Sequence, residues 1–134
     1  MLKKTITYID YNDNERTEDF YFNLNKAELA EMEFGTSGGF ADMIQHIIAA
    51  KDTYALIKIF KELLLKSYGE KSQDGKRFIK SDEIRDSFSQ TEAYSNLFME
   101  LATNEEAASN FIKGILPKEL QNVDTKPLLT DNKQ

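Results

Sequence analysis

The single histidine, His46, is the residue best suited to acid–base chemistry, because an imidazole titrates near neutrality. Asp42 precedes it by four residues, so on a helix its carboxylate would lie beside the imidazole and orient it. The neighbouring positions Met43, Ala49 and Ala50 supply neither a nucleophile nor a second ligand. An ordinary i, i+4 pair on the polar side of a helix explains both residues, and we expect no catalytic residues in this chain.

Acidic residues cluster at three places, but none has the pattern of a metal site. Asp10, Asp13 and Glu15 surround a turn without the glycine and the spacing of a calcium loop. The adjacent pairs Asp82–Glu83 and Glu105–Glu106 follow residues able to cap a helix, where carboxylates offset the helix dipole. Adjacent residues on a helix also point in different directions. We therefore expect no metal and no other cofactor.

A glycine-rich stretch, Gly35-Thr36-Ser37-Gly38-Gly39, has a superficial likeness to a phosphate-binding loop. It lacks the Gly-Lys-Ser/Thr ending that places a lysine on the phosphates. It also follows an expected helix, where a strand is required. A hinge between two helices is the better interpretation.

The 134 residues carry a net charge of −6 and no cysteine, which excludes disulfides and thiolate metal sites. Because phosphate contacts need lysine and arginine, this acidic balance argues against nucleic acid as a partner. Basic residues are interleaved with the acidic ones, as on an ordinary solvated surface. No apolar run reaches the ~18 residues of a membrane span, and the N-terminus lacks a signal-peptide pattern. We expect a cytoplasmic protein with no membrane partner.

The beginning of the chain has a strand pattern. Thr5–Tyr11 is rich in β-branched and aromatic residues, and Asn12–Asn14 is a turn signal. Thr17–Leu24 resumes the pattern, with every second residue from Phe20 onward apolar. We predict an antiparallel hairpin over residues 5–24. Because an isolated hairpin is marginal in water, its apolar face must pack against helices.

Helical spacing and capping residues fill the chain from residue 25 to residue 116. The expected helix starts are at Asn25, Asp52, Ser81, Ser89 and Thr103. Gly69 closes the longest helix, and residues 70–80 are interpreted as a turn or exposed loop. The predicted fold class is α+β and predominantly α, an N-terminal antiparallel β-hairpin packed on a compact bundle of about five or six short helices. We expect one globular domain over residues 1–117 and a flexible tail over residues 118–134.

The aromatic residues divide into two groups. The phenylalanines on expected core faces are Phe20, Phe22, Phe60, Phe88, Phe98 and Phe111. Five tyrosines suit either the edge of the core or a protein interface, and their position in the sequence does not separate the two roles: Tyr8, Tyr11, Tyr21, Tyr68 and Tyr94.

Three stretches within residues 3–117 resemble the tail assembly chaperones of long, non-contractile-tailed phages and prophages of Gram-positive bacteria. They are Lys4–Tyr8 continuing to Asp19–Leu24, Lys66–Ser72 with Asp74–Phe78, and Phe88–Tyr94 running into Phe98–Ala102. None of the three is a mechanistic motif, so the resemblance is one of overall sequence pattern.

The resemblance implies that the protein covers the long helical tape measure protein, keeps it soluble, and helps recruit major tail (tube) protein during tail morphogenesis. It also implies absence from the mature virion and no catalytic residues; self-association is a further expectation. The candidate groove for the tape measure helix is the apolar face formed by Phe40, Ile44, Ile47 and Ile48. In the alternative interpretation the same face packs internally on the helix that carries Leu56 to Leu64.

Two other classes of function stay open. One is a phage-encoded acidic inhibitor or DNA-mimic protein that acts on a host enzyme, which would need a stripe of carboxylates at phosphate-like spacing. The other is a small enzyme built around Asp42 and His46, which would need a polar pocket beside that pair. Neither has a positive feature in the sequence beyond the Asp42–His46 pair itself.

Overall fold

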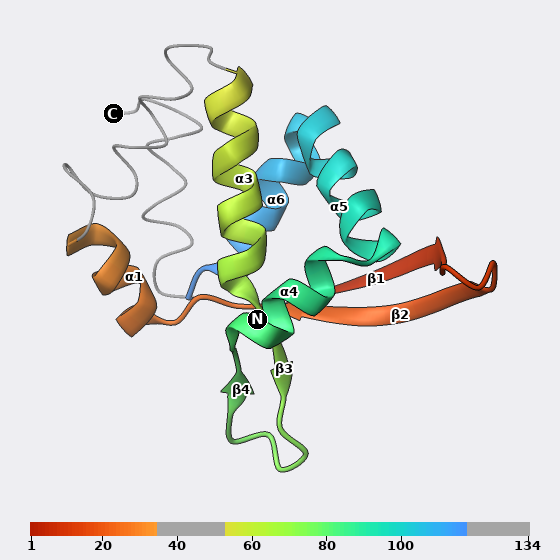
Figure 1. The fold of residues 1–134 in the computed structure, drawn as a ribbon. Helices are drawn as coiled ribbons and strands as arrows, with labels where there is room; N and C mark the ends of the chain where they lie inside the picture. The colour runs from red at the N-terminus through yellow and green to blue at the C-terminus, as the bar shows by residue number, and fades with distance from the viewer. Residues whose placement is uncertain (35–52, 118–134) are drawn as a thin grey trace.

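The computed structural model describes residues 1–34 and 53–117 (Figure 1). The chain begins with two antiparallel strands, β1 (Leu2–Ile9) and β2 (Glu15–Phe22), in a register that pairs the first residue of β1 with the last of β2. In the turn between them, Asp13 adopts a φ of 64°, a conformation that Asp and Asn tolerate better than most residues. The predicted N-terminal hairpin is confirmed.

A second hairpin, β3 (Tyr68–Lys71) and β4 (Phe78–Ile79), extends the sheet to four strands in the order β1-β2-β3-β4. The prediction of a turn or loop over residues 70–80 is therefore wrong for residues 70–71 and 78–79, which belong to strands. A turn does connect the two strands. Gly69 does not close a helix; it lies within β3, opposite Tyr21. A Cβ atom on Gly69 would lie 2.8 Å from Cε2 of Phe78, so the close approach of β4 requires glycine there.

The described helices are α1 (Lys26–Phe34), α3 (Thr53–Ser67), α4 (Asp82–Ser89), α5 (Glu92–Thr103) and α6 (Glu105–Ile115). In Figure 1, α3, α5 and α6 stand on one side of the first hairpin, and the second hairpin projects on the other. Both α5 and α6 pack against β1, and α3 packs against α5. This arrangement is the predicted α+β fold, a hairpin packed on short helices.

The helix starts confirm two predicted caps and correct two others. Asn25 and Glu28 form the predicted reciprocal capping box, at 2.9 and 2.8 Å, and Ser81 accepts from the backbone N–H of Ile84. The caps of α5 and α6 are Thr91 and Asn104, not Ser89 and Thr103. Ser89 and Thr103 instead end the preceding helices, where their hydroxyls donate to the carbonyl oxygens of Asp86 and Met99.

The short link after β2 is bonded to two helix ends. The backbone N–H of Asn23 donates to the carbonyl oxygen of Ser67, at the end of α3, at 2.8 Å. The next N–H, that of Leu24, donates to the carbonyl oxygen of Ile115, at the end of α6, also at 2.8 Å. Otherwise unpaired carbonyls at the last turns of both helices are thereby satisfied. The link therefore fixes the first hairpin to the C-terminal ends of α3 and α6.

The core lies between the sheet and the helices. Phe22, Phe60, Phe88 and Phe111 are buried as predicted, whereas Phe20 and Phe98 are partly buried against the same core. Tyr68 stacks on Phe88 with ring centroids 4.1 Å apart, and the edge of Phe22 meets Phe111 at 5.4 Å. Burial of these rings contributes to the hydrophobic stabilisation of the sheet–helix contact.

No helix in residues 1–34 or 53–117 is long and apolar enough to cross a membrane. Three predictions lie outside the described residues: the helix expected after the glycine-rich stretch, the cap Asp52, and the tail over residues 118–134.

Candidate functional site

The residues singled out from the sequence for chemistry and for helix binding lie outside the described part of the chain. This holds for the Asp42–His46 pair and for the apolar face of Phe40, Ile44, Ile47 and Ile48. Their roles stay predictions.

Asp10 and the two acidic pairs at helix starts serve local structure. The Asp10 carboxylate accepts from two backbone N–H groups of its own turn and from Nε of Arg16. The Arg16 bond, helped by those backbone bonds, lowers the pKa of Asp10 below its ordinary value. The acidic pairs at residues 82–83 and 105–106 stand in the first turns of α4 and α6. Among the described residues, no group of three or more potential ligands is placed to hold a metal ion.

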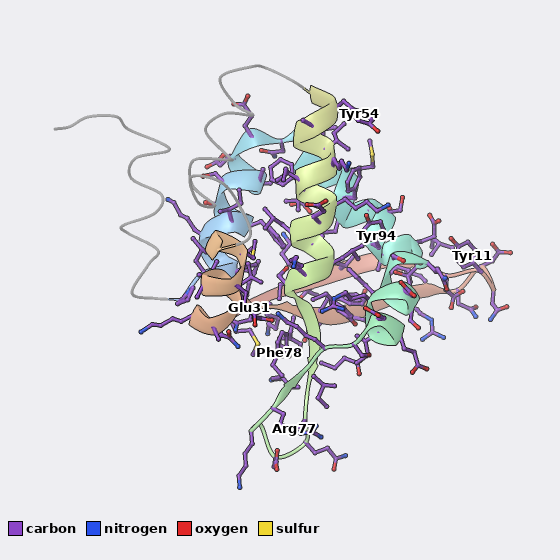
Figure 2. All side chains as sticks on the ribbon, turned by 60° about the vertical axis from the view of Figure 1, so that its left-hand side comes forward. Tyr11, Glu31, Tyr54, Arg77, Phe78 and Tyr94 are labelled. Carbon is purple, nitrogen blue, oxygen red and sulfur yellow. The ribbon has the colours of Figure 1, made fainter. Side chains whose placement is uncertain are left out.

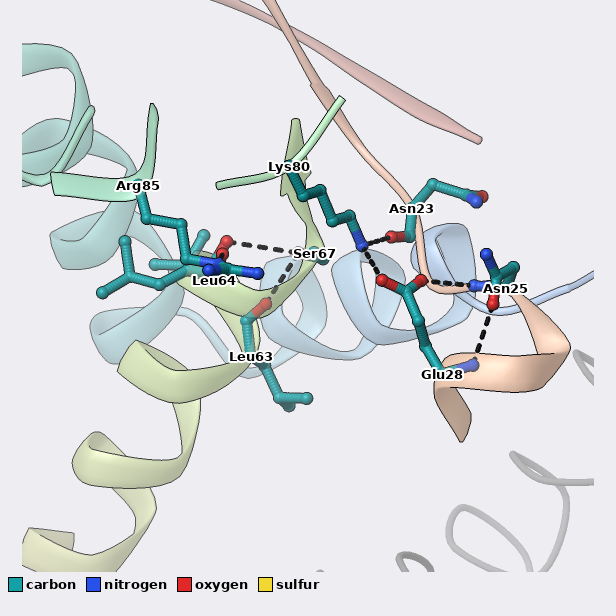
Figure 3. Close-up of polar contacts among 9 residues, drawn as sticks. Asn23, Asn25, Glu28, Leu63, Leu64, Ser67, Lys80 and Arg85 are labelled. Atoms are coloured by element: carbon teal, nitrogen blue, oxygen red, sulfur yellow. Dashed lines mark hydrogen bonds and ion pairs between the residues drawn. The ribbon is translucent and has the colours of Figure 1, made fainter. Parts of the chain in front are cut away.

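A part-buried polar cluster joins α1 to the second hairpin (Figure 3). Nζ of Lys80, just after β4, donates to the carbonyl oxygen of Asn23 and to Oε2 of Glu28, both at 2.7 Å. The other carboxylate oxygen of Glu28 accepts from the backbone N–H of Asn25. Burial lowers the pKa of Lys80, and the ion pair with Glu28 opposes that shift. The cluster is a structural brace, since Lys80 binds both the link after β2, through Asn23, and the first turn of α1, through Glu28.

The structure separates the tyrosines that the sequence could not divide. Tyr68 is a core residue, and burial raises the pKa of its hydroxyl to about 12. Tyr8 and Tyr94 lie at the edge of the core, where Tyr8 donates to Glu18 at 2.6 Å. Tyr11 is exposed at the end of the first hairpin and donates to Glu92. Tyr21 is covered by Nζ of Lys71 at 4.4 Å from the ring centroid.

An exposed apolar face on the first turns of α3 was missed by the sequence reasoning. Tyr54 is 79% exposed and Ile57, three residues later on the same side of the helix, is 37% exposed. Tyr54 lies at the N-terminal end of α3, on the outer surface (Figure 2). One signal was available: the apolar arc of this helix is wider than one buried face needs. Large exposed apolar side chains grouped in this way are typical of protein interfaces.

A second feature is a depression of about 250 Å³ where the start of β1 meets the α5–α6 corner. Leu2, Ala107 and Phe111 supply apolar lining, and the polar lining includes Lys4, Glu100, Asn104, Glu106 and Asn110. Sequence reasoning identified Glu106 only as an acid at a helix start. Nothing in the sequence indicates this site, because residues 2–4 and 100–111 come together only in the fold.

A family model described as "Phage tail assembly chaperone" matches residues 1–133 of the chain. No curated protein and no solved structure gave a match.

Proposed function

The chain belongs to the phage tail assembly chaperone family, whose role is non-enzymatic, and we propose that it binds the tape measure protein and keeps it soluble. In this proposal it also helps recruit tail tube subunits during morphogenesis. It acts in the cytoplasm of the host bacterium and leaves before the virion is complete. The observation that carries the proposal is the family match over residues 1–133, nearly the whole chain.

The physical need for such a cover comes from the shape of the partner. A long amphipathic helix has an apolar stripe that aggregates in water unless another apolar surface covers it. Tyr54 and Ile57 offer exposed apolar area of the kind used in helix-in-groove recognition. We propose that they extend the predicted face of Phe40, Ile44, Ile47 and Ile48, which precedes them in the sequence.

The acidic-inhibitor alternative has no comparable support. A DNA mimic needs carboxylates that stand free in a regular stripe. Here several carboxylates at or near the surface are paired with cations, as in Arg16 with Asp10 and Glu18, and Lys4 with Glu100. Such mixed pairs are typical of an ordinary solvated surface.

Co-expression with the tape measure protein tests the proposal. We expect the tape measure protein to move from the insoluble to the soluble fraction and to co-purify with this chain at moderate salt, because screening weakens mainly charge interactions. A tape measure protein that is equally insoluble with and without this chain would falsify the proposal.

A matched pair of variants locates the contact. Tyr54→Ala should weaken the complex about fivefold, as expected for an aromatic contact residue. Tyr11→Ala removes an equally exposed tyrosine from the far end of the first hairpin and should leave affinity unchanged. If both variants are folded by circular dichroism and lose affinity equally, the contact with the tape measure protein does not lie on α3. At the predicted face, Ile44→Asp should weaken binding at least tenfold. This result counts only if circular dichroism shows that the variant is folded.

A further inference from the structure

We infer that the depression between β1, α5 and α6 receives a lysine or arginine side chain from the helix that this protein covers. The inference rests on the proposed function and deepens it, since it assigns the partner a basic polar face. It also assigns a role to residues that the family description leaves without one.

The size and lining of the depression fit one long side chain. Its volume of about 250 Å³ is below the roughly 300–1,000 Å³ of sites that enclose small-molecule ligands. Leu2, Ala107 and Phe111 offer apolar surface for a hydrocarbon stem. Lysine and arginine combine such a stem with a charged end, and they bury the stem while the charge stays at a polar rim.

The charge of the rim selects a cation. Glu100 and Glu106 contribute two carboxylates against the single ammonium of Lys4. Lys4 lies 3.4 Å from Glu100, and both side chains are part exposed, so this pair is weak and an incoming cation can share the carboxylate. Within the described residues, no hydrogen bond or ion pair engages the carboxylate of Glu106. The whole chain is acidic as well, at −6.

An anion is disfavoured at the same place, although the start of α6 lies beside it. Asn104 caps this helix and accepts from the backbone N–H of Ala107 at 3.0 Å. Glu105 and Glu106 already place two negative charges in its first turn. A further anion would meet these carboxylates, whereas the amide oxygen of Asn110 adds another acceptor for a donating ammonium or guanidinium.

Two synthetic amphipathic peptides of about 20 residues, long enough to form helices, serve as probes. They share one apolar stripe and differ only on the polar face, which carries lysine in one peptide and glutamate in the other. We expect the lysine-faced peptide to bind more tightly, and its advantage to shrink as salt rises. Because the acidic chain as a whole also favours that peptide, variants of the depression must isolate the local effect.

Glu106→Gln should weaken binding of the lysine-faced peptide about two- to fivefold and leave the glutamate-faced peptide unchanged or slightly improved. Glu105→Gln is the matched control: it removes the same charge from the same helical turn, but its side chain does not line the depression. Asn110→Asp adds a carboxylate to the rim and should tighten binding of the lysine-faced peptide by a similar factor. All three side chains are exposed, so the fold should tolerate the changes.

Each outcome decides between the two proposals. A selective loss in Glu106→Gln, together with a gain in Asn110→Asp, supports the inference. Equal losses in Glu105→Gln and Glu106→Gln, or equal binding of both peptides, overturn it while the proposed function stands. If neither peptide binds and the tape measure protein also stays insoluble, both proposals fail. If Glu106→Gln abolishes self-association and leaves peptide binding unchanged, the depression receives a side chain from a second copy of this chain, and the inference is overturned.

Discussion

The two hairpins of the sheet are held in different ways. β1 and β2 pair along eight residues each and bury one face against α5 and α6. β3 and β4 share two residue pairs, and the strand contact of their hairpin with the first is limited to Tyr21–Gly69 and Phe22–Tyr68. The first hairpin is therefore held by its own long strand pairing. The second hairpin depends on the contacts that Tyr68 and Gly69 make at its base. Four changes, from the largest expected effect to the smallest, test that difference.

Phe22→Ala should have the largest effect, because this residue supports both hairpins. Its ring is fully buried and lies 5.4–5.8 Å from the rings of Tyr68, Phe88 and Phe111. Truncation of a buried phenylalanine costs about 3–5 kcal/mol of unfolding free energy. Urea denaturation measures this loss. A loss below about 1 kcal/mol would show that the base of the second hairpin does not depend on the end of β2.

High pH should destabilise the protein through Tyr68, at the base of the second hairpin. Burial raises the pKa of this hydroxyl from 10.0 to about 12. The unfolded chain therefore loses the proton first, and the folded state loses stability as pH rises from about 10 through 12. A shift of two pKa units corresponds to a loss of roughly 3 kcal/mol.

Tyr68→Phe keeps the ring stack on Phe88 and removes the titrating hydroxyl. Denaturation midpoints across this range of pH should fall less steeply in this variant than in the natural sequence. Identical slopes would place the alkaline transition elsewhere, for example at Tyr94, whose pKa burial also raises.

Gly69→Ala tests the close approach within the second hairpin. The added methyl group would lie 2.8 Å from Cε2 of Phe78 and 2.9 Å from the carbonyl oxygen of Ile79. Since backbone is one of the two neighbours, we expect a loss of about 1–3 kcal/mol. Hydrogen exchange should show faster opening at β3 and β4 than in β1. Uniform loss of protection along the whole sheet would contradict the expectation that β1 and β2 stay paired when β3 and β4 are weakened.

Gly75→Ala should have the smallest effect. Gly75 lies in the turn of the second hairpin with a φ of +76°, and nothing lies within 4 Å of a Cβ built there. The cost is then only that of a left-handed alanine, about 1 kcal/mol. A thermal midpoint lowered as far as in Gly69→Ala would mean that the tip, not the base, determines the stability of this hairpin.

The same difference explains what the sequence could predict. The first hairpin was predictable because apolar residues alternate from Phe20 to Leu24 and a turn signal precedes them. The second has strands too short for any period to show, and its position is set by contacts of Gly69 and Tyr68 with a strand distant in sequence. The role of Lys80 at the base of the second hairpin could not be predicted either, because Asn23 and Glu28, which Lys80 binds, are distant along the chain.

The starts of α1, α4, α5 and α6 were predictable to within one or two residues, for a local reason. Ser89 and Thr91 can both cap a helix, as can Thr103 and Asn104, so the sequence offers two candidates at each corner. The residue with extended backbone becomes the cap, and Thr91 and Asn104 have it, with ψ values of 156° and 106°. Backbone angles of this kind follow from how neighbouring helices pack, which a local pattern does not contain.

The bonds of the link after β2 bear on the order in which the protein matures during translation. The carbonyl of Ile115 that receives the N–H of Leu24 is made near the end of the described chain. In a growing polypeptide the first hairpin leaves the ribosome before α6 does. Until α6 has emerged, the N–H of Leu24 lacks its acceptor and Phe111 does not yet cover the ring of Phe22. Packing of the first hairpin on the helices therefore waits for α6, and nascent chains that stop before α6 expose the apolar surface around Phe22.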